Sequence, residues 1–166
     1  MIVVSDTSPL NYLVLIGAID VLPKLFGEVY APPAVIQELQ HPRTPAIVKH
    51  WAQSPPSWLR VDSPSASIAS TAGLDPGEAQ AIALAVELGA DALLIDEKKG
   101  RRIAKSRGFV TLGTTTVLEL AAEDGLLDLK SAFDALQQTT FHITQHLLDE
   151  ALARDAKRKA QRGANP

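Results

Sequence analysis

Short apolar segments that end in aspartate alternate along this chain with longer segments of helical character. Residues 2–5 (IVVS) are followed by Asp6, and the apolar run ALLI is followed by Asp96. Short β-branched and apolar runs of this kind are typical of strands buried on both faces of a parallel sheet. Strands that alternate with helices predict an α/β fold, a three-layer α/β/α sandwich with a mostly parallel central sheet.

The remaining elements are expected between turn-forming residues. Further strands are predicted at 28–33 (strand and turn), 58–62, 91–96 and 109–113. Helices are predicted at 8–26 (as two short helices), 33–41, 44–53, 76–89, 97–108, 114–125, 128–138 and 144–160. Ser8 is expected to cap the first helix, with Pro9 at its first position. The small polar stretch 63–73 is expected to be a surface loop.

Length and composition suit one compact domain. The chain has 166 residues, of which 46% are hydrophobic and 21% charged, as is ordinary for a globular protein. We expect a domain over residues 1–150 and a basic tail over 151–166, at the end of the last helix, that frays. The absence of cysteine excludes disulfides, zinc–thiolate sites and cysteine nucleophiles. The N-terminus does not resemble a signal peptide, and no apolar run approaches the roughly 18–20 residues of a membrane span. A cytoplasmic protein with no membrane partner is therefore expected.

Glu78 occupies an unexpected place in the segment LDPGEAQAIALA. On a helix that advances about 100° per residue, Glu78 shares the apolar side with Ile82 and Ala85. One explanation is a capping box, with Asp75 as N-cap, Pro76 as first helical residue and Glu78 reaching back to the N-cap amide. The other is a metal ligand, since a bare buried carboxylate is costly. The two roles are compatible.

Asp6 and Asp96 each follow a predicted strand. Functional residues of parallel sheets gather beyond the carboxyl ends of strands, so both carboxylates are expected at one edge of the sheet. Because Ser8 and Pro9 already supply a helix start, Asp6 is free for another role. Asp96 could instead cap the helix that begins at residue 97. Glu38, in VIQEL, flanks the apolar side of its helix, and by periodicity alone it is an ordinary exposed glutamate.

Taken together, the four carboxylates Asp6, Glu38, Glu78 and Asp96 make a hard, oxygen-rich donor set. Such a set suits Mg²⁺ or Mn²⁺ rather than zinc or copper. Ions of this kind bind phosphate oxygens and promote attack of water on a phosphodiester. Clustered carboxylates also repel one another in the absence of a cation.

A basic stretch, EKKGRRIAKSRG, begins directly after Asp96. Lys98, Arg101, Arg102 and Lys105 are spaced to share one helix face. A solvated surface face is the usual meaning of such a pattern. Beside an acidic metal site, the same face predicts contact with a nucleic-acid backbone, and Lys98, Arg101 and Arg102 are the candidates for phosphate binding.

These segments together resemble the PIN-domain superfamily, in a VapC-like branch. The resemblance covers about residues 1–150 and is carried by VVSDTSPLNYL, APPAVIQEL, GEAQAIALAVELGADALLIDEKKGRRIAKSRG and TLGTTTVLELAAEDGLL. It implies that Asp6, Glu38, Glu78 and Asp96 hold one or two Mg²⁺ or Mn²⁺ ions and are catalytic. Asp75, Thr7 and Ser8 are then outer-shell residues. This chain has Glu78 where many members have aspartate, and EKKGR where an acidic and aromatic continuation is more usual.

The resemblance further implies a metal-dependent endoribonuclease with an RNA substrate. Many proteins of this kind are toxins neutralised by a small antitoxin protein, and PIN domains commonly form homodimers. The alternative is a catalytically inactive PIN-like module that binds RNA or a protein. Two other phosphoryl-transfer classes are disfavoured, because SDTS lacks the D-x-D of haloacid-dehalogenase-type phosphatases and the chain has no P-loop sequence.

Overall fold

The computed structural model describes residues 1–68 and 73–164. Residues 69–72, which belong to the predicted loop 63–73, lie outside the described residues. The chain forms two compact units, Met1–Thr114 and Thr115–Pro166. The first unit contains the sheet and the carboxylates of interest, and the second is helical.

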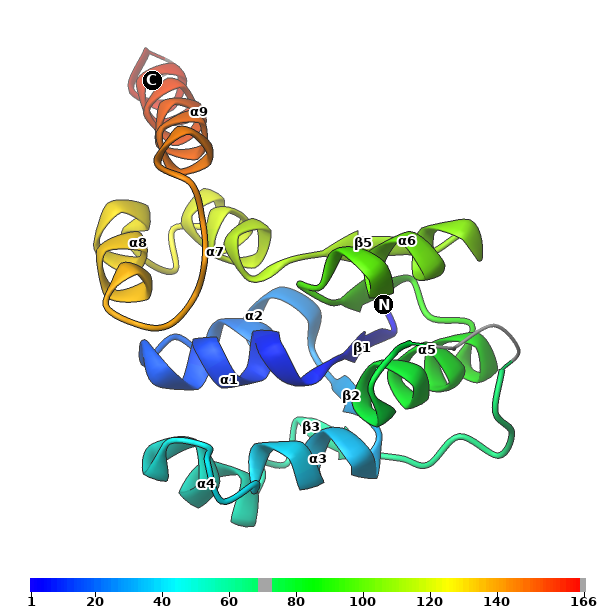
Figure 1. Cartoon of the computed structure of the whole chain (residues 1–166). Coiled ribbons are helices and arrows are strands. Elements are labelled where there is room, and N and C mark those ends of the chain that lie inside the picture. Colours follow the sequence, from blue (N-terminus) through cyan, green and yellow to red (C-terminus); the bar gives the residue numbers. More distant parts are fainter. Residues whose placement is uncertain (69–72, 165–166) are drawn as a thin grey trace. The chain divides into compact units, whose positions relative to one another are not determined.

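The described part of the first unit builds one five-stranded sheet (Figure 1). Its strands are β1 (Val3–Ser5), β2 (Val29–Ala31), β3 (Leu59–Val61), β4 (Ala92–Leu94) and β5 (Val110–Leu112). They lie in the order β3-β2-β1-β4-β5, and every neighbouring pair is parallel. β1, the central strand, is buried along its length. The predicted parallel α/β fold is confirmed.

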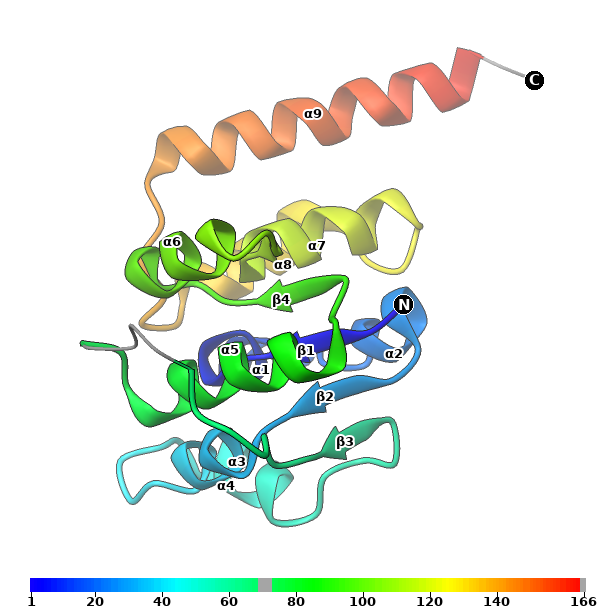
Figure 2. The same cartoon turned by 90° about the vertical axis from the view of Figure 1, so that its right-hand side faces the viewer.

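Helices cover both faces of this sheet. They are α1 (Thr7–Leu15), α2 (Val21–Phe26), α3 (Pro33–Leu39), α4 (Ala46–Gln53), α5 (Pro76–Leu88) and α6 (Lys98–Ser106). α5 and α6 contribute Ile82 and Ala104 to a buried cluster that also contains Val4, Leu93 and Ile95 of the sheet region. α1 and α2 lie on the opposite side of the sheet from α5 (Figure 2). The result is the three-layer α/β/α arrangement that the sequence predicts.

The second unit is built from α7 (Thr114–Glu123, which begins on the last residue of the first unit), α8 (Leu129–Gln137) and α9 (Gln145–Ala164). α8 buries Phe133 and Leu136, and α9 buries Leu148. Arg154 of α9 pairs with Glu119 of α7 at 2.9 Å. α9 extends beyond the predicted end at residue 160. Among the described residues, no helix combines the length and apolar character that crossing a bilayer requires.

The strand order positions the candidate site. β1 and β4 are neighbours, and the chain leaves them toward opposite faces, into α1 and α6. Such a reversal creates a crevice at the carboxyl ends of the strands, where ligands of open α/β sheets bind. Asp6 continues the ladder at this edge, because its N–H donates to the Leu94 carbonyl at 2.9 Å. The prediction that Ser8 caps α1 is wrong: the helix begins at Thr7, and Asp6 is its N-cap residue.

Candidate metal centre

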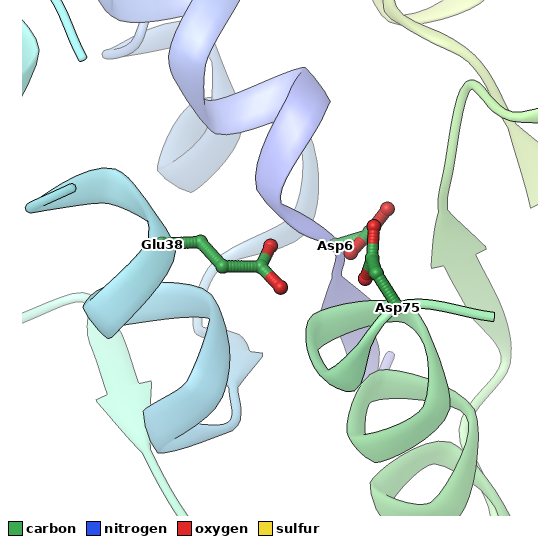
Figure 3. A group of neighbouring side chains, drawn as sticks. All are labelled: Asp6, Glu38 and Asp75. Carbon is green, nitrogen blue, oxygen red and sulfur yellow. The ribbon is translucent and has the colours of Figure 1, made fainter. Parts of the chain in front are cut away.

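Three carboxylates from distant parts of the sequence meet at this edge (Figure 3). Asp6 follows β1, Glu38 belongs to α3, and Asp75 is the N-cap residue of α5. One oxygen from each lies within 4.8 Å of the others. The spacing of oxygens in this acid cluster, which we define as Asp6, Glu38 and Asp75, is compatible with ligation of one divalent ion.

Asp6 is the most deeply buried member of the acid cluster. Its exposed fraction is 3%, and its side chain makes no capping hydrogen bond to α1. Its Oδ1 atom has no hydrogen-bond partner among the described residues. Burial, together with the charges of Asp75, Glu78 and Glu38, raises the pKa of Asp6 to about 8. The metal-free fold therefore favours the protonated form of a group that would be ionised if it were solvated.

Glu38 is half-buried and is held by two donors. The Thr7 hydroxyl donates to its Oε2 atom, and the Gly77 N–H donates to its Oε1 atom at 2.9 Å. Partial burial raises the pKa of Glu38, and these two hydrogen bonds oppose that shift. Thr7 is the first residue of α1 and Gly77 the second residue of α5. The Glu38 carboxylate therefore accepts hydrogen bonds from the N-terminal turns of two helices.

Asp75 and Glu78 form the capping box that the sequence allows. Asp75 Oδ1 accepts from the Glu78 N–H at 2.8 Å, and Glu78 Oε2 accepts from the Asp75 N–H at 3.1 Å. Capping uses only one Glu78 oxygen. The residue is 5% exposed, and its Oε1 has no hydrogen-bond partner among the described residues. Burial raises the pKa of Glu78. Glu78 is thus a cap that also presents a spare buried oxygen, although it lies outside the acid cluster.

Asp96 follows β4 at the same edge and is engaged differently. Its Oδ1 accepts from the Thr114 N–H at 2.8 Å, and its Oδ2 accepts from the Thr114 hydroxyl at 2.7 Å. Ser8 also donates to it, and the charge of Arg101 lies nearby. Burial still raises the pKa of Asp96. Asp96 is therefore tied to the first residue of α7 and is not part of the acid cluster.

A cavity of about 350 Å³ opens beside the acid cluster. Its acidic lining residues are Asp6, Glu38, Asp75 and Glu97. Polar side chains of Thr7, Ser8, Asn11, Tyr12 and Thr44 complete most of the wall, and the described lining residues include no lysine or arginine. A phosphate group entering this cavity would meet negative charge alone, unless a cation were bound there.

The three predicted phosphate-binding residues lie on α6 but differ in exposure. Lys98 and Arg102 are exposed, and Arg101 is half-buried. Arg101 faces Asp96 closely enough for its charge to lower the pKa of that carboxyl, against the effect of burial. Lys98 and Arg102 are consequently the better placed of the three to meet a ligand from solvent.

Sequence reasoning missed two residues that hold the carboxylates. Thr114 binds both oxygens of Asp96, and Gly77 donates to Glu38. Thr114 gives little signal, because it is one of three consecutive threonines at the start of a helix. Gly77 gives a partial signal. A glycine in the first turn of an alanine-rich helix lowers helix propensity, which indicates a packing or functional role at that position.

The site fits a hard divalent ion by its own features. All of the donors are carboxylate oxygens, as Mg²⁺ and Mn²⁺ prefer. Asp6 Oδ1 and Glu78 Oε1 are buried acceptors without protein donors among the described residues, and an unsatisfied buried acceptor normally costs about 1–3 kcal/mol. Burial raises the pKa of Asp6, Glu38 and Glu78 alike. A cation bound by the acid cluster would relieve these costs for Asp6 and Glu38.

The sequence model of a family described as a PIN domain matches residues 2–157, from the start of β1 into α9. Searches of curated proteins and of solved structures found no match.

Proposed function

Since this chain belongs to the PIN-domain family, we propose that it is a metal-dependent ribonuclease that hydrolyses RNA phosphodiester bonds. The observation that carries the proposal is the meeting of Asp6, Glu38 and Asp75 within 4.8 Å of one another. This meeting occurs at the carboxyl edge of the sheet, where open α/β folds bind their ligands. A binding module would have no use for a carboxylate as deeply buried as Asp6 beside two further acids.

In this proposal, Asp6, Glu38 and Asp75 hold Mg²⁺ or Mn²⁺. When bound, the ion supplies a Lewis acid that stabilises charge on the phosphodiester and lowers the pKa of an attacking water. Glu78 lies outside the acid cluster, and its charge contributes to the raised pKa of Asp6. Both oxygens of Asp96 already accept hydrogen bonds from Thr114. In this proposal Asp96 orients Thr114 and Ser8 and is not a direct ligand of the ion.

The protein's own residues contribute orientation as well as charge. Thr7 and Gly77 fix both oxygens of Glu38, which limits the rotamers that the ligand can adopt. Preorganised ligands lose less entropy on binding, and ordered partners of metal ligands strengthen metal affinity. Thr7 and Ser8 line the cavity beside Asp6. Their hydroxyl protons are donated to Glu38 and Asp96, so each hydroxyl oxygen can accept a hydrogen bond from a water in the cavity.

Metal removal tests this function directly. RNA cleavage by the purified protein should disappear in excess EDTA and return when Mn²⁺ or Mg²⁺ is added beyond the chelator. The reason is that the cavity holds acids and no described cation that could replace the ion. Cleavage that persists in EDTA would contradict the proposal. RNA binding without cleavage under every metal condition would support the alternative of an inactive binding module.

We propose that Lys98 and Arg102 contact the RNA backbone, which their exposure at the start of α6 supports. Changing both to alanine should weaken RNA binding at all sequences. It should also reduce the slope of log K against log salt by about 1.4, because each contact to single-stranded RNA contributes about 0.7. Fluorescence anisotropy with a labelled oligonucleotide, across several salt concentrations, measures both effects.

The exposed lysine of α2, Lys24, supplies the control for this experiment. Lys24→Ala removes a positive charge on the other side of the sheet and should leave the salt slope unchanged. Equal effects at Lys24 and at the α6 residues would show that net charge alone governs binding. Neutralisation by a small antitoxin and formation of a homodimer stay predictions from the resemblance.

A further inference from the structure

We infer that Gly77 is a positioning residue for the proposed metal site, because the absence of a side chain there lets Glu38 reach its place in the acid cluster. The inference rests on the proposed function and deepens it. Gly77 touches no substrate or ion in this account. It acts through Glu38, to which its N–H donates at 2.9 Å.

The approach between the two residues leaves no room for a side chain. A Cβ atom built on Gly77 would lie 2.5 Å from Glu38 Oε2, 2.7 Å from Oε1 and 2.8 Å from the carboxyl carbon. Ordinary van der Waals contacts of a Cβ atom begin at 3.4 Å. The whole carboxylate would have to move to admit even a methyl group.

Backbone conformation does not explain this glycine. Gly77 lies in the first turn of α5, and it is not among the glycines with positive φ. Alanine is the better helix former at a position of this kind. The chain thus has a less favourable helical residue at the one place where α5 meets a carboxylate of α3, and the close approach of Glu38 accounts for it.

Gly77→Ala should therefore leave the fold intact and disturb the site. The carboxylate is the far end of a flexible side chain, and it borders the cavity, so it can swing away from the new methyl group. In doing so it leaves the Thr7 hydroxyl and the Gly77 N–H. Loss of the partners that orient a metal ligand typically costs about 10- to 100-fold in metal affinity.

A double-mutant cycle with Glu38→Asp tests the inference. The variants are Gly77→Ala, Glu38→Asp and the two combined, with Gly163→Ala as control. Gly163 lies in α9 with nothing within 4 Å of its Cβ position. Mn²⁺ affinity is measured by calorimetry, and the melting temperature is measured without metal and with saturating Mn²⁺. RNA cleavage is recorded in parallel.

We expect Gly77→Ala to weaken Mn²⁺ binding about 10- to 100-fold and to remove most of the Mn²⁺-induced rise in melting temperature. Glu38→Asp should weaken binding by itself, because the shorter carboxylate does not reach the acid cluster. The shorter side chain also vacates the space beside residue 77. In that background Gly77→Ala should cause no further loss, and it should raise the metal-free melting temperature through better helix propensity. Coupling between the two positions is the signature of this contact.

Wild-type Mn²⁺ affinity in Gly77→Ala would overturn the inference, as would additive effects of the two changes on metal-free stability. A loss of affinity equal to that of Gly163→Ala would also overturn it. Failure of the wild-type protein to bind Mn²⁺ has a different meaning. It would remove the proposed metal-dependent function, and with it the metal-positioning role of Gly77, while the stability coupling between residues 77 and 38 would still be seen.

Discussion

Asp6→Asn should make the metal-free protein more stable and at the same time make it inactive. Asp6 is 3% exposed, and its pKa is raised from 3.8 to about 8. Folding at neutral pH must therefore protonate this carboxyl or bury its charge. Each pKa unit corresponds to about 1.4 kcal/mol, and we expect relief on the order of 1–3 kcal/mol when the ionisable group is removed. Asparagine can donate to the neighbouring carboxylates, so the new amide finds acceptors.

The same change should lower RNA cleavage by at least about 100-fold, because it removes an ionised ligand from the metal site. Thermal melts in chelated buffer and after addition of Mn²⁺ separate the two effects. In chelated buffer the variant should have a higher melting temperature than the wild type. Addition of Mn²⁺ should raise the melting temperature of the variant less than that of the wild type. Asp20→Asn is the matched control, since Asp20 is also an N-cap residue without a side-chain capping bond, but it is exposed. A clear loss of metal-free stability in Asp6→Asn would contradict the view that burial of Asp6 beside other carboxylates destabilises the metal-free fold.

The metal-free protein should also lose stability as pH rises through the neutral range. Between pH 3.8 and about 8, the folded state retains a proton on Asp6 that the unfolded state has released. Stability is therefore fully present below pH 3.8 and falls as pH rises toward 8, by about 1.4 kcal/mol per pH unit in the middle of this window. The pKa values of Glu38, Glu78 and Asp96 are also raised, and each of these groups likewise lowers the stability of the metal-free protein as pH rises above its ordinary pKa.

Saturating Mn²⁺ should flatten this dependence, because bound carboxylates are ionised and metal binding releases their protons. Urea unfolding at pH 5, 6, 7 and 8, with and without Mn²⁺, measures the change in the free energy of unfolding. Asp6→Asn should flatten the metal-free curve on its own. A metal-free stability that is constant or rises between pH 5 and pH 7 would show that Asp6 does not carry a raised pKa.

Periodicity and composition were enough to predict the α/β class and the approximate place of each element. The reason is that strand and helix signals here are local: apolar runs of a few residues, helix caps and glycine stops. The capping box of Asp75 and Glu78 is local in the same way, since its partners are three positions apart, and the structure contains this one of the two roles considered for Glu78. The N-cap of α1 was misplaced by two residues because both Asp6 and Ser8 are acceptable cap residues.

The composition of the site was harder to predict. The sequence, with the family resemblance, predicts Asp6, Glu38, Glu78 and Asp96 as ligands and Asp75 as an outer-shell residue, and this assignment stays a prediction. In the structure, Asp75 lies beside Asp6 and Glu38, and Asp96 is bound to Thr114. Which oxygen of a carboxylate remains free depends on donors that lie far along the chain. Periodicity carries no information about such donors.

The sequence alone predicts a parallel α/β fold with acids at the carboxyl ends of its strands. It can do so because burial patterns and helix caps depend on residues that are close together in the sequence. The grouping of Asp6, Glu38 and Asp75, the spare oxygen of Glu78 and the need for glycine at position 77 arise only when α3 and α5 pack against each other beyond β1. Distances between side chains set pKa values, free acceptors and room for a ligand. Those distances exist only in the folded protein.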